Sequence, residues 1–147
     1  MKKSHRSRRA EAAALAFTIL APVAVSLYAL HAWGADITAT LTGAQEVPPV
    51  TTKATGTAMI TISGDRAVSG TITTTGVDAT AAHIHEAPSG KNGGIIVPFV
   101  KSGDKWTIPP GAKLTEAQHK SFQDGNLYVN VHSAANKDGE IRGQLKP

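Results

Sequence analysis

Three histidines in the second half of the chain have the types and spacing that could perform chemistry. His83 and His85 are two residues apart in the segment Ala-Ala-His-Ile-His-Glu. Side chains alternate between the two faces of a strand, so both imidazoles project from one face while Ile84 points to the other. His132 ends a second alternating segment, residues 127–132. Three imidazoles from two strands suit copper or zinc if those strands approach each other, and we predict a metal site at these histidines.

A polar strand face accompanies the third histidine. Asn130 shares a face with His132, and Glu140 and Arg142 share a face in the next segment, residues 140–145. We predict that Asn130, Glu140 and Arg142 form a supporting polar face for the histidines. Networks of this kind are commonly structural. We therefore expect Glu140 and Arg142 to form an ion pair across the face, or to brace the turn, rather than to catalyse a reaction.

A plainer interpretation of the His-x-His pair remains open. Polar strand faces are usually hydrogen-bonded to their neighbours, and the histidines could simply brace the sheet.

The residues that several other kinds of site require are missing. The chain has no cysteine, which excludes thiolate zinc sites, iron–sulfur clusters and blue-copper centres. No phosphate-binding glycine motif occurs, and neither Ser89 nor Ser133 lies in a Gly-x-Ser-x-Gly motif, so a nucleophilic hydrolase is not expected.

The excess positive charge belongs to the N-terminal segment alone. Residues 1–35 contain five basic groups and one acidic group, whereas residues 36–147 contain ten of each. Nucleic-acid binding depends mainly on basic groups that neutralise phosphates. A neutral domain without a run of lysine or arginine lacks that feature, so no nucleic-acid partner is expected; the partner remains an unknown protein or a metal ligand.

The first 35 residues have the layout of an export signal. Five basic residues precede an uncharged apolar stretch, residues 12–30, and Ala32-Trp33-Gly34 offers small residues for signal peptidase. We predict a signal helix and a cleaved signal peptide over residues 1–35, and hence a periplasmic or secreted protein. The alternative is an uncleaved N-terminal anchor, because 19 uncharged residues approach the roughly 20 that span a bilayer. In that case residues 12–30 would provide the only membrane contact.

Residues 36–147 read as a single all-β domain. Short alternating runs rich in Thr, Val and Ile are typical of antiparallel strands with one buried face, and an apolar run at residues 95–100 predicts one more. Thr115 and Gln118 have the spacing of a capping box and Gly125 can end a helix, so one short helix is expected near residues 115–124. The prediction is an antiparallel, Greek-key-like β-sandwich or barrel of about seven to eight strands, closed by a hairpin of residues 127–132 and 140–145.

Four sequence blocks occur together in this domain. They are Leu-Thr-Gly-Ala-Gln-Glu-Val-Pro-Pro-Val at residues 41–50, Ala-His-Ile-His at residues 82–85, Leu-Tyr-Val-Asn-Val-His-Ser at residues 127–133 and Gly-Glu-Ile-Arg-Gly-Gln-Leu at residues 139–145. In this order they resemble the CHRD domain family, named after the extracellular protein chordin. The resemblance implies a CHRD domain over residues 36–147 and an exported protein, and it implies no activity. The first hypothesis is therefore a non-catalytic binding or structural module.

A second resemblance is confined to the histidines. His83, His85 and His132 look like three copper ligands on the strands of copper/zinc superoxide dismutases, which are also β-sandwiches. It suggests a periplasmic copper-binding protein as the alternative function, with copper as the possible cofactor. A dismutase-like metalloenzyme is a second, disfavoured alternative, because the bridging histidine, the zinc ligands and the disulfide cysteines of that family have no counterparts here.

Overall fold

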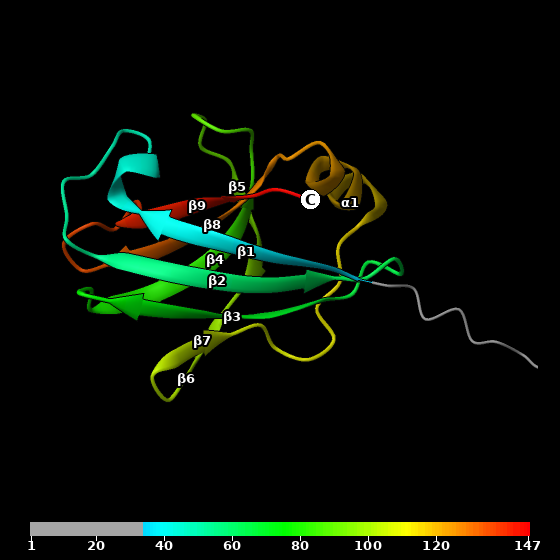
Figure 1. The fold of residues 1–147 in the computed structure, drawn as a ribbon, viewed down its shortest axis with the longest axis horizontal. Coiled ribbons are helices and arrows are strands. Elements are labelled where there is room, and N and C mark those ends of the chain that lie inside the picture. The colour runs from blue at the N-terminus through cyan, green and yellow to red at the C-terminus, as the bar shows by residue number, and fades with distance from the viewer. Residues whose placement is uncertain (1–33) are drawn as a thin grey trace, which may run out of the picture. The chain divides into compact units, whose positions relative to one another are not determined.

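The computed structural model describes residues 34–147, which form nine strands, one α-helix and one short 3-10 helix (Figure 1). Most of the leader predicted over residues 1–35, and the whole of the alternative anchor at residues 12–30, lie outside the described residues, which include only Gly34 and Ala35 of the leader. Within the described part, no helix is long and apolar enough to cross a membrane. The elements are β1 (Ala35–Thr42), η1 (Gly43–Gln45), β2 (Thr55–Ile62), β3 (Val68–Thr75), β4 (Ala79–Glu86), β5 (Gly94–Pro98), β6 (Val100–Ser102), β7 (Lys105–Thr107), α1 (Glu116–Gln123), β8 (Leu127–Ser133) and β9 (Ile141–Leu145).

The strands form one antiparallel sheet in the order β5-β4-β8-β9-β1-β2-β3-β7-β6, and this sheet curls into a nearly closed barrel (Figure 1). Strands β1, β2 and β3 follow one another as hairpins, and β9 returns to lie beside β1, as in a Greek key. The strand that follows β3 in the sequence does not lie beside it in the sheet: β4 pairs with β5 and β8 instead. The predicted all-β antiparallel class is confirmed.

Alternation of apolar and polar residues explains which face of each strand is buried. In β2, Ala58 and Ile60 are buried while Thr57 and Met59 are exposed, so this strand contributes every second residue to the core. The same alternation in β4 buries Ile84 completely. The histidines on either side of Ile84 are thereby placed on the face of β4 that is opposite the core.

The sheet has nine strands rather than the predicted seven to eight. The difference arises from β6 and β7, each three residues long, which is too short for an alternating pattern to be recognised. The apolar run at residues 95–100 is also divided between β5 and β6, because Pro98 ends β5 and the next backbone N–H, from Phe99, donates to Ala82 O. Ile95 and Val100 from this run are exposed rather than buried.

The predicted helix is confirmed as α1, Glu116–Gln123. Thr115 and Gln118 form the expected capping box: the Thr115 side chain accepts from Gln118 N, and the Gln118 side chain accepts from Thr115 N. Gly125 follows the helix with φ +75°, the left-handed conformation that favours glycine at a helix end. The predicted closing hairpin is also present, since β8 and β9 pair from Leu127–Leu145 to Val131–Ile141.

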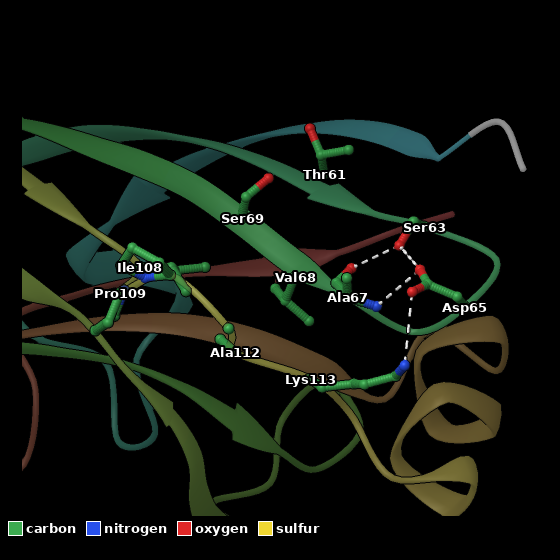
Figure 2. A pocket seen from close by; sticks show the side chains of 12 residues that line it. Thr61, Ser63, Asp65, Ala67, Val68, Ser69, Ile108, Pro109, Ala112 and Lys113 are labelled. Carbon is green, nitrogen blue, oxygen red and sulfur yellow. Dashed lines mark hydrogen bonds and ion pairs between the residues drawn. The ribbon is translucent and has the colours of Figure 1, made fainter. Parts of the chain in front are cut away.

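A surface pocket of about 520 Å³ lies beside the β2–β3 turn (Figure 2). In the turn, the Ser63 hydroxyl donates to Asp65 and to Ala67 O, and Lys113 reaches Asp65 at 3.5 Å. Both charged side chains are largely exposed, so the ion pair contributes little stability. These polar groups satisfy one another, and the contacts tie the β2–β3 turn to the segment before α1.

Candidate metal centre

The fold brings the three predicted histidines together. Strands β4 and β8 are antiparallel neighbours in which His83 lies opposite Asn130 and His132 lies opposite Ala81. One ligand nitrogen from each histidine can be chosen so that all three lie within 4.8 Å of one another. The closest pair is His83 Nδ1 and His132 Nε2, 3.1 Å apart. His85 completes the cluster, with its ring centroid 5.6 Å from that of His83 and 5.9 Å from that of His132.

Backbone carbonyls determine the tautomers of two of these rings. Nδ1 of His85 lies 3.0 Å from Gly93 O, and Nδ1 of His132 lies 2.9 Å from Lys137 O. A carbonyl oxygen only accepts, so both Nδ1 atoms donate and each neutral ring presents the Nε2 lone pair. Nε2 of His85 is buried without a hydrogen-bond partner. Histidines that bind metal are commonly held in this way by a second hydrogen bond.

The environment favours the neutral form of the imidazoles, which is the form that binds metal. Burial, and to a smaller extent the neighbouring His132 and His85, lower the pKa of His83 from 6.5 to about 4. Burial also lowers the pKa of His85, against the opposing effect of its bond to Gly93 O. Desolvation disfavours a charged imidazolium. Both rings are therefore neutral at pH 7.

Acid should destabilise the metal-free domain through His83. The pKa of His83 in the folded state is below its ordinary value of 6.5, so its stabilising contribution is complete above pH 6.5 and is lost as the pH falls toward 4. Relative to a His83→Asn variant, the wild type should lose about 1 kcal/mol of unfolding free energy between pH 7 and pH 5, after allowance for partial exposure. Urea unfolding at the two pH values measures this. Parallel pH dependences in the two proteins would contradict it.

A stack of side chains supports His85. Its ring lies on Tyr128, with centroids 4.9 Å apart and an interplanar angle of 10°, and the Arg142 guanidinium carbon lies 3.4 Å from the centroid of the same Tyr128 ring. Gly93 N also donates to the Tyr128 hydroxyl at 3.1 Å. The backbone of Gly93 is thus held at both ends, by Tyr128 at its N–H and by His85 at its carbonyl. These contacts keep the His85 imidazole in place.

The predicted polar face is buried, but its members do not pair as expected. No ion pair joins Glu140 and Arg142 in the part of the chain that the structure describes. Glu140 instead accepts from Thr52 at 2.8 Å and from Ser133, and the Ser133 bond is the largest effect lowering the pKa of this carboxyl. Glu140 therefore acts as a turn brace, because Ser133 is the last residue of β8 and Glu140 directly precedes β9. The ion pair was a wrong expectation.

Arg142 turns in the opposite direction along the face. Its guanidinium donates to Asn92 Oδ1 at 3.3 Å and to Pro88 O at 3.4 Å, both in the β4–β5 loop that contains Gly93. Glu140 and Arg142 belong to the same polar face, but their hydrogen-bond partners lie in different parts of the chain. Arg142 therefore stabilises the loop that orients His85, and Glu140 stabilises the loop that orients His132.

Sequence reasoning did not assign a site role to Glu46 or Gly93. Glu46 is only 5% exposed, and its Oε2 accepts from Asn130 Nδ2 at 3.1 Å. A glutamate in a proline-rich loop is normally expected at the surface, so composition offered no signal for this burial. Gly93 belongs to a glycine-rich loop that indicates only turn geometry. The contacts of both residues depend on tertiary structure.

The cluster opens to solvent on one side. A pocket of about 510 Å³ lies over His83 and His132, and its other lining residues are Thr80, Ala81, Ile95, Ser133, Ala134 and Lys137. His85 lies deeper and is only 7% exposed. Any ion at the cluster would therefore be held from below by His85 and could be reached from the pocket.

The geometry defines a class: a small antiparallel β-barrel domain with a three-histidine cluster on the face of the sheet opposite its core. Residues 37–145 match the model of the CHRD domain family. The chain belongs to the CHRD domain family, as the sequence blocks had suggested. No curated protein and no solved structure matches it.

Proposed function

We propose that this chain is an exported, non-catalytic copper-binding protein, and that His83, His85 and His132 hold a single ion. The observation that carries the proposal is the convergence of three ligand nitrogens within 4.8 Å. The hydrogen bonds from Nδ1 of His85 and His132 to carbonyl oxygens support it. In the metal-free protein the hydrogen between His83 Nδ1 and His132 Nε2 belongs to His83, because His132 Nε2 carries a lone pair. An ion bound by both nitrogens would replace this hydrogen, and His83 would then carry its proton on Nε2.

The donor set favours copper among the common metals. All three candidate ligands are imidazoles, and no carboxylate belongs to the cluster. Calcium and magnesium prefer oxygen ligands, whereas imidazole suits copper and zinc. Nitrogen sites generally bind Cu²⁺ more tightly than Zn²⁺. Zinc is the nearest rival, because it accepts the same three ligands.

Export and a binding role have separate support. The basic and then apolar leader has the layout of an export signal, and chordin-type domains are typically extracellular. The pocket over His83 and His132 is lined mainly by small or apolar side chains. It offers an ion a route in and out, as a protein that stores or transfers metal requires.

Metal titration of the purified domain, residues 36–147, tests the proposal. We expect one Cu(II) or Cu(I) ion per chain in the presence of a competing chelator, and weaker binding of Zn(II). A His83→Ala/His85→Ala double variant should lose this binding. Equal, weak binding in both proteins would overturn the copper site and leave the histidines as a structural brace. Tighter binding of zinc than of copper would overturn the choice of metal.

A further inference from the structure

Two buried oxygens next to the histidine cluster have no hydrogen-bond donor. Glu46 and Asn130 are 5% and 2% exposed, and one hydrogen bond joins them, from Asn130 Nδ2 to Glu46 Oε2 at 3.1 Å. The other oxygen of each group, Glu46 Oε1 and Asn130 Oδ1, is buried without a partner. Leaving a buried polar atom unpaired is costly. A proton on one of these two oxygens would turn it into a donor for the other.

Gly139 packs closely against both side chains. An ideal Cβ on Gly139 would lie 2.5 Å from both Asn130 Nδ2 and Asn130 Oδ1, and 2.7 Å from Glu46 Oε1. That position is one bond length from the Gly139 Cα, so a metal ion or a water molecule there would overlap the backbone. A proton needs no such space. A hydroxyl hydrogen on Glu46 Oε1 could therefore satisfy both atoms.

We propose that Glu46 is a protonated carboxylic acid in the folded domain and forms a closed acid–amide pair with Asn130. In this pair Asn130 Nδ2–H donates to Glu46 Oε2, and Glu46 Oε1–H donates to Asn130 Oδ1. The acid form makes two hydrogen bonds where the carboxylate makes one. Ionisation would also place a negative oxygen against the Asn130 carbonyl.

The surroundings of Glu46 support the neutral form. Burial raises the pKa of Glu46 to about 7, against the lowering effects of the Asn130 hydrogen bond and of the Arg142 charge on β9. Lys137 and Asp138 of the β8–β9 loop line the same pocket as Glu46. They carry opposite charges near the surface. On the acid side of pH 7 the proton therefore remains on Glu46.

The pair connects three parts of the chain. Glu46 follows η1, Asn130 lies in β8, and Gly139 belongs to the β8–β9 loop that provides the carbonyl for His132. The acid–amide pair therefore packs against that loop at Gly139. It requires no metal, so the proposal stands or falls independently of the copper site.

Protonation of Glu46 should make the folded domain less stable as the pH rises. The pKa of Glu46 in the folded state is above its ordinary value of 4.5, so the stabilising contribution is complete below pH 4.5 and is lost as the pH rises through 7. A Glu46→Gln variant keeps both hydrogen bonds, because its amide donates to Asn130 Oδ1 and its carbonyl accepts from Nδ2. This variant cannot titrate at that position.

Urea unfolding of the metal-free domain from pH 5 to pH 9 tests the pair. Relative to Glu46→Gln, the folding equilibrium of the wild type should weaken by up to about a hundredfold across this range. The same comparison with Glu116→Gln, an exposed glutamate of α1, should show no such divergence. Parallel curves for the wild type and Glu46→Gln would overturn the proposal.

A second measurement keeps the proposal testable if Glu46→Gln fails to fold. In wild-type protein labelled with ¹³C at the glutamate carboxyl carbons, one carboxyl should titrate near pH 7. Its chemical shift below that pH should be that of a protonated acid. If every glutamate carboxyl titrates within about one unit of its ordinary value of 4.3 to 4.5, the acid–amide pair does not exist.

Discussion

A His132→Ala variant should bind copper more than about 100-fold more weakly than the wild type, because His132 is the proposed ligand from β8. Its Nε2 lies 3.1 Å from His83 Nδ1, and its removal leaves two ligands on β4 alone. Loss of an outer hydrogen-bond partner typically weakens metal binding 10- to 100-fold. Loss of a ligand itself should cost more. Chelator competition at pH 7 measures the effect.

The matched control for this variant is His119→Ala. His119 lies on α1, outside the cluster, so its removal should leave the affinity unchanged. Bound metal also stabilises the folded state, by about 2.7 kcal/mol at a hundred times Kd. Copper should therefore raise the Tm of the wild type and of His119→Ala but not that of His132→Ala. Equal stabilisation of all three proteins would place copper elsewhere on the chain.

Gly93→Ala should be the most damaging single-methyl substitution near the site. A Cβ on Gly93 would lie 1.8 Å from Glu86 O and 2.6 Å from Glu86 C, both backbone atoms of β4. Neither can move without shifting the strand that contains His83 and His85. Overpacking typically costs 1 to 3 kcal/mol, and we expect about 3 kcal/mol of unfolding free energy here, measured by urea unfolding.

The substitution should also weaken copper binding, because Gly93 O accepts from His85 Nδ1. Gly94→Ala provides the matched control: it introduces the same methyl group one residue later, where no atom lies within 4 Å of the added Cβ. Gly94→Ala should change neither stability nor copper affinity by a measurable amount. If the two variants behave alike, the close approach of Gly93 to β4 is not what orients His85.

Much of the fold could be predicted from local patterns. Alternation assigned Ala58, Ile60 and Ile84 to the core, and the Thr115–Gln118 capping box located α1. These features depend on residues a few positions apart, and the same physical preferences act on them in any tertiary context. Strands β6 and β7 were not predicted, because three residues cannot show a period of two.

The site was predictable only in part. The sequence determined that His83 and His85 share one face of a strand, that His132 ends another strand, and that no thiol accompanies them, since side-chain direction follows from the two-residue repeat of a strand. Only the tertiary structure decided that β4 lies beside β8, that carbonyls of two loops orient His85 and His132, and that Glu46 is buried against Asn130. Strand order and loop packing result from burying the apolar faces of the whole chain at once, and no short segment contains that information.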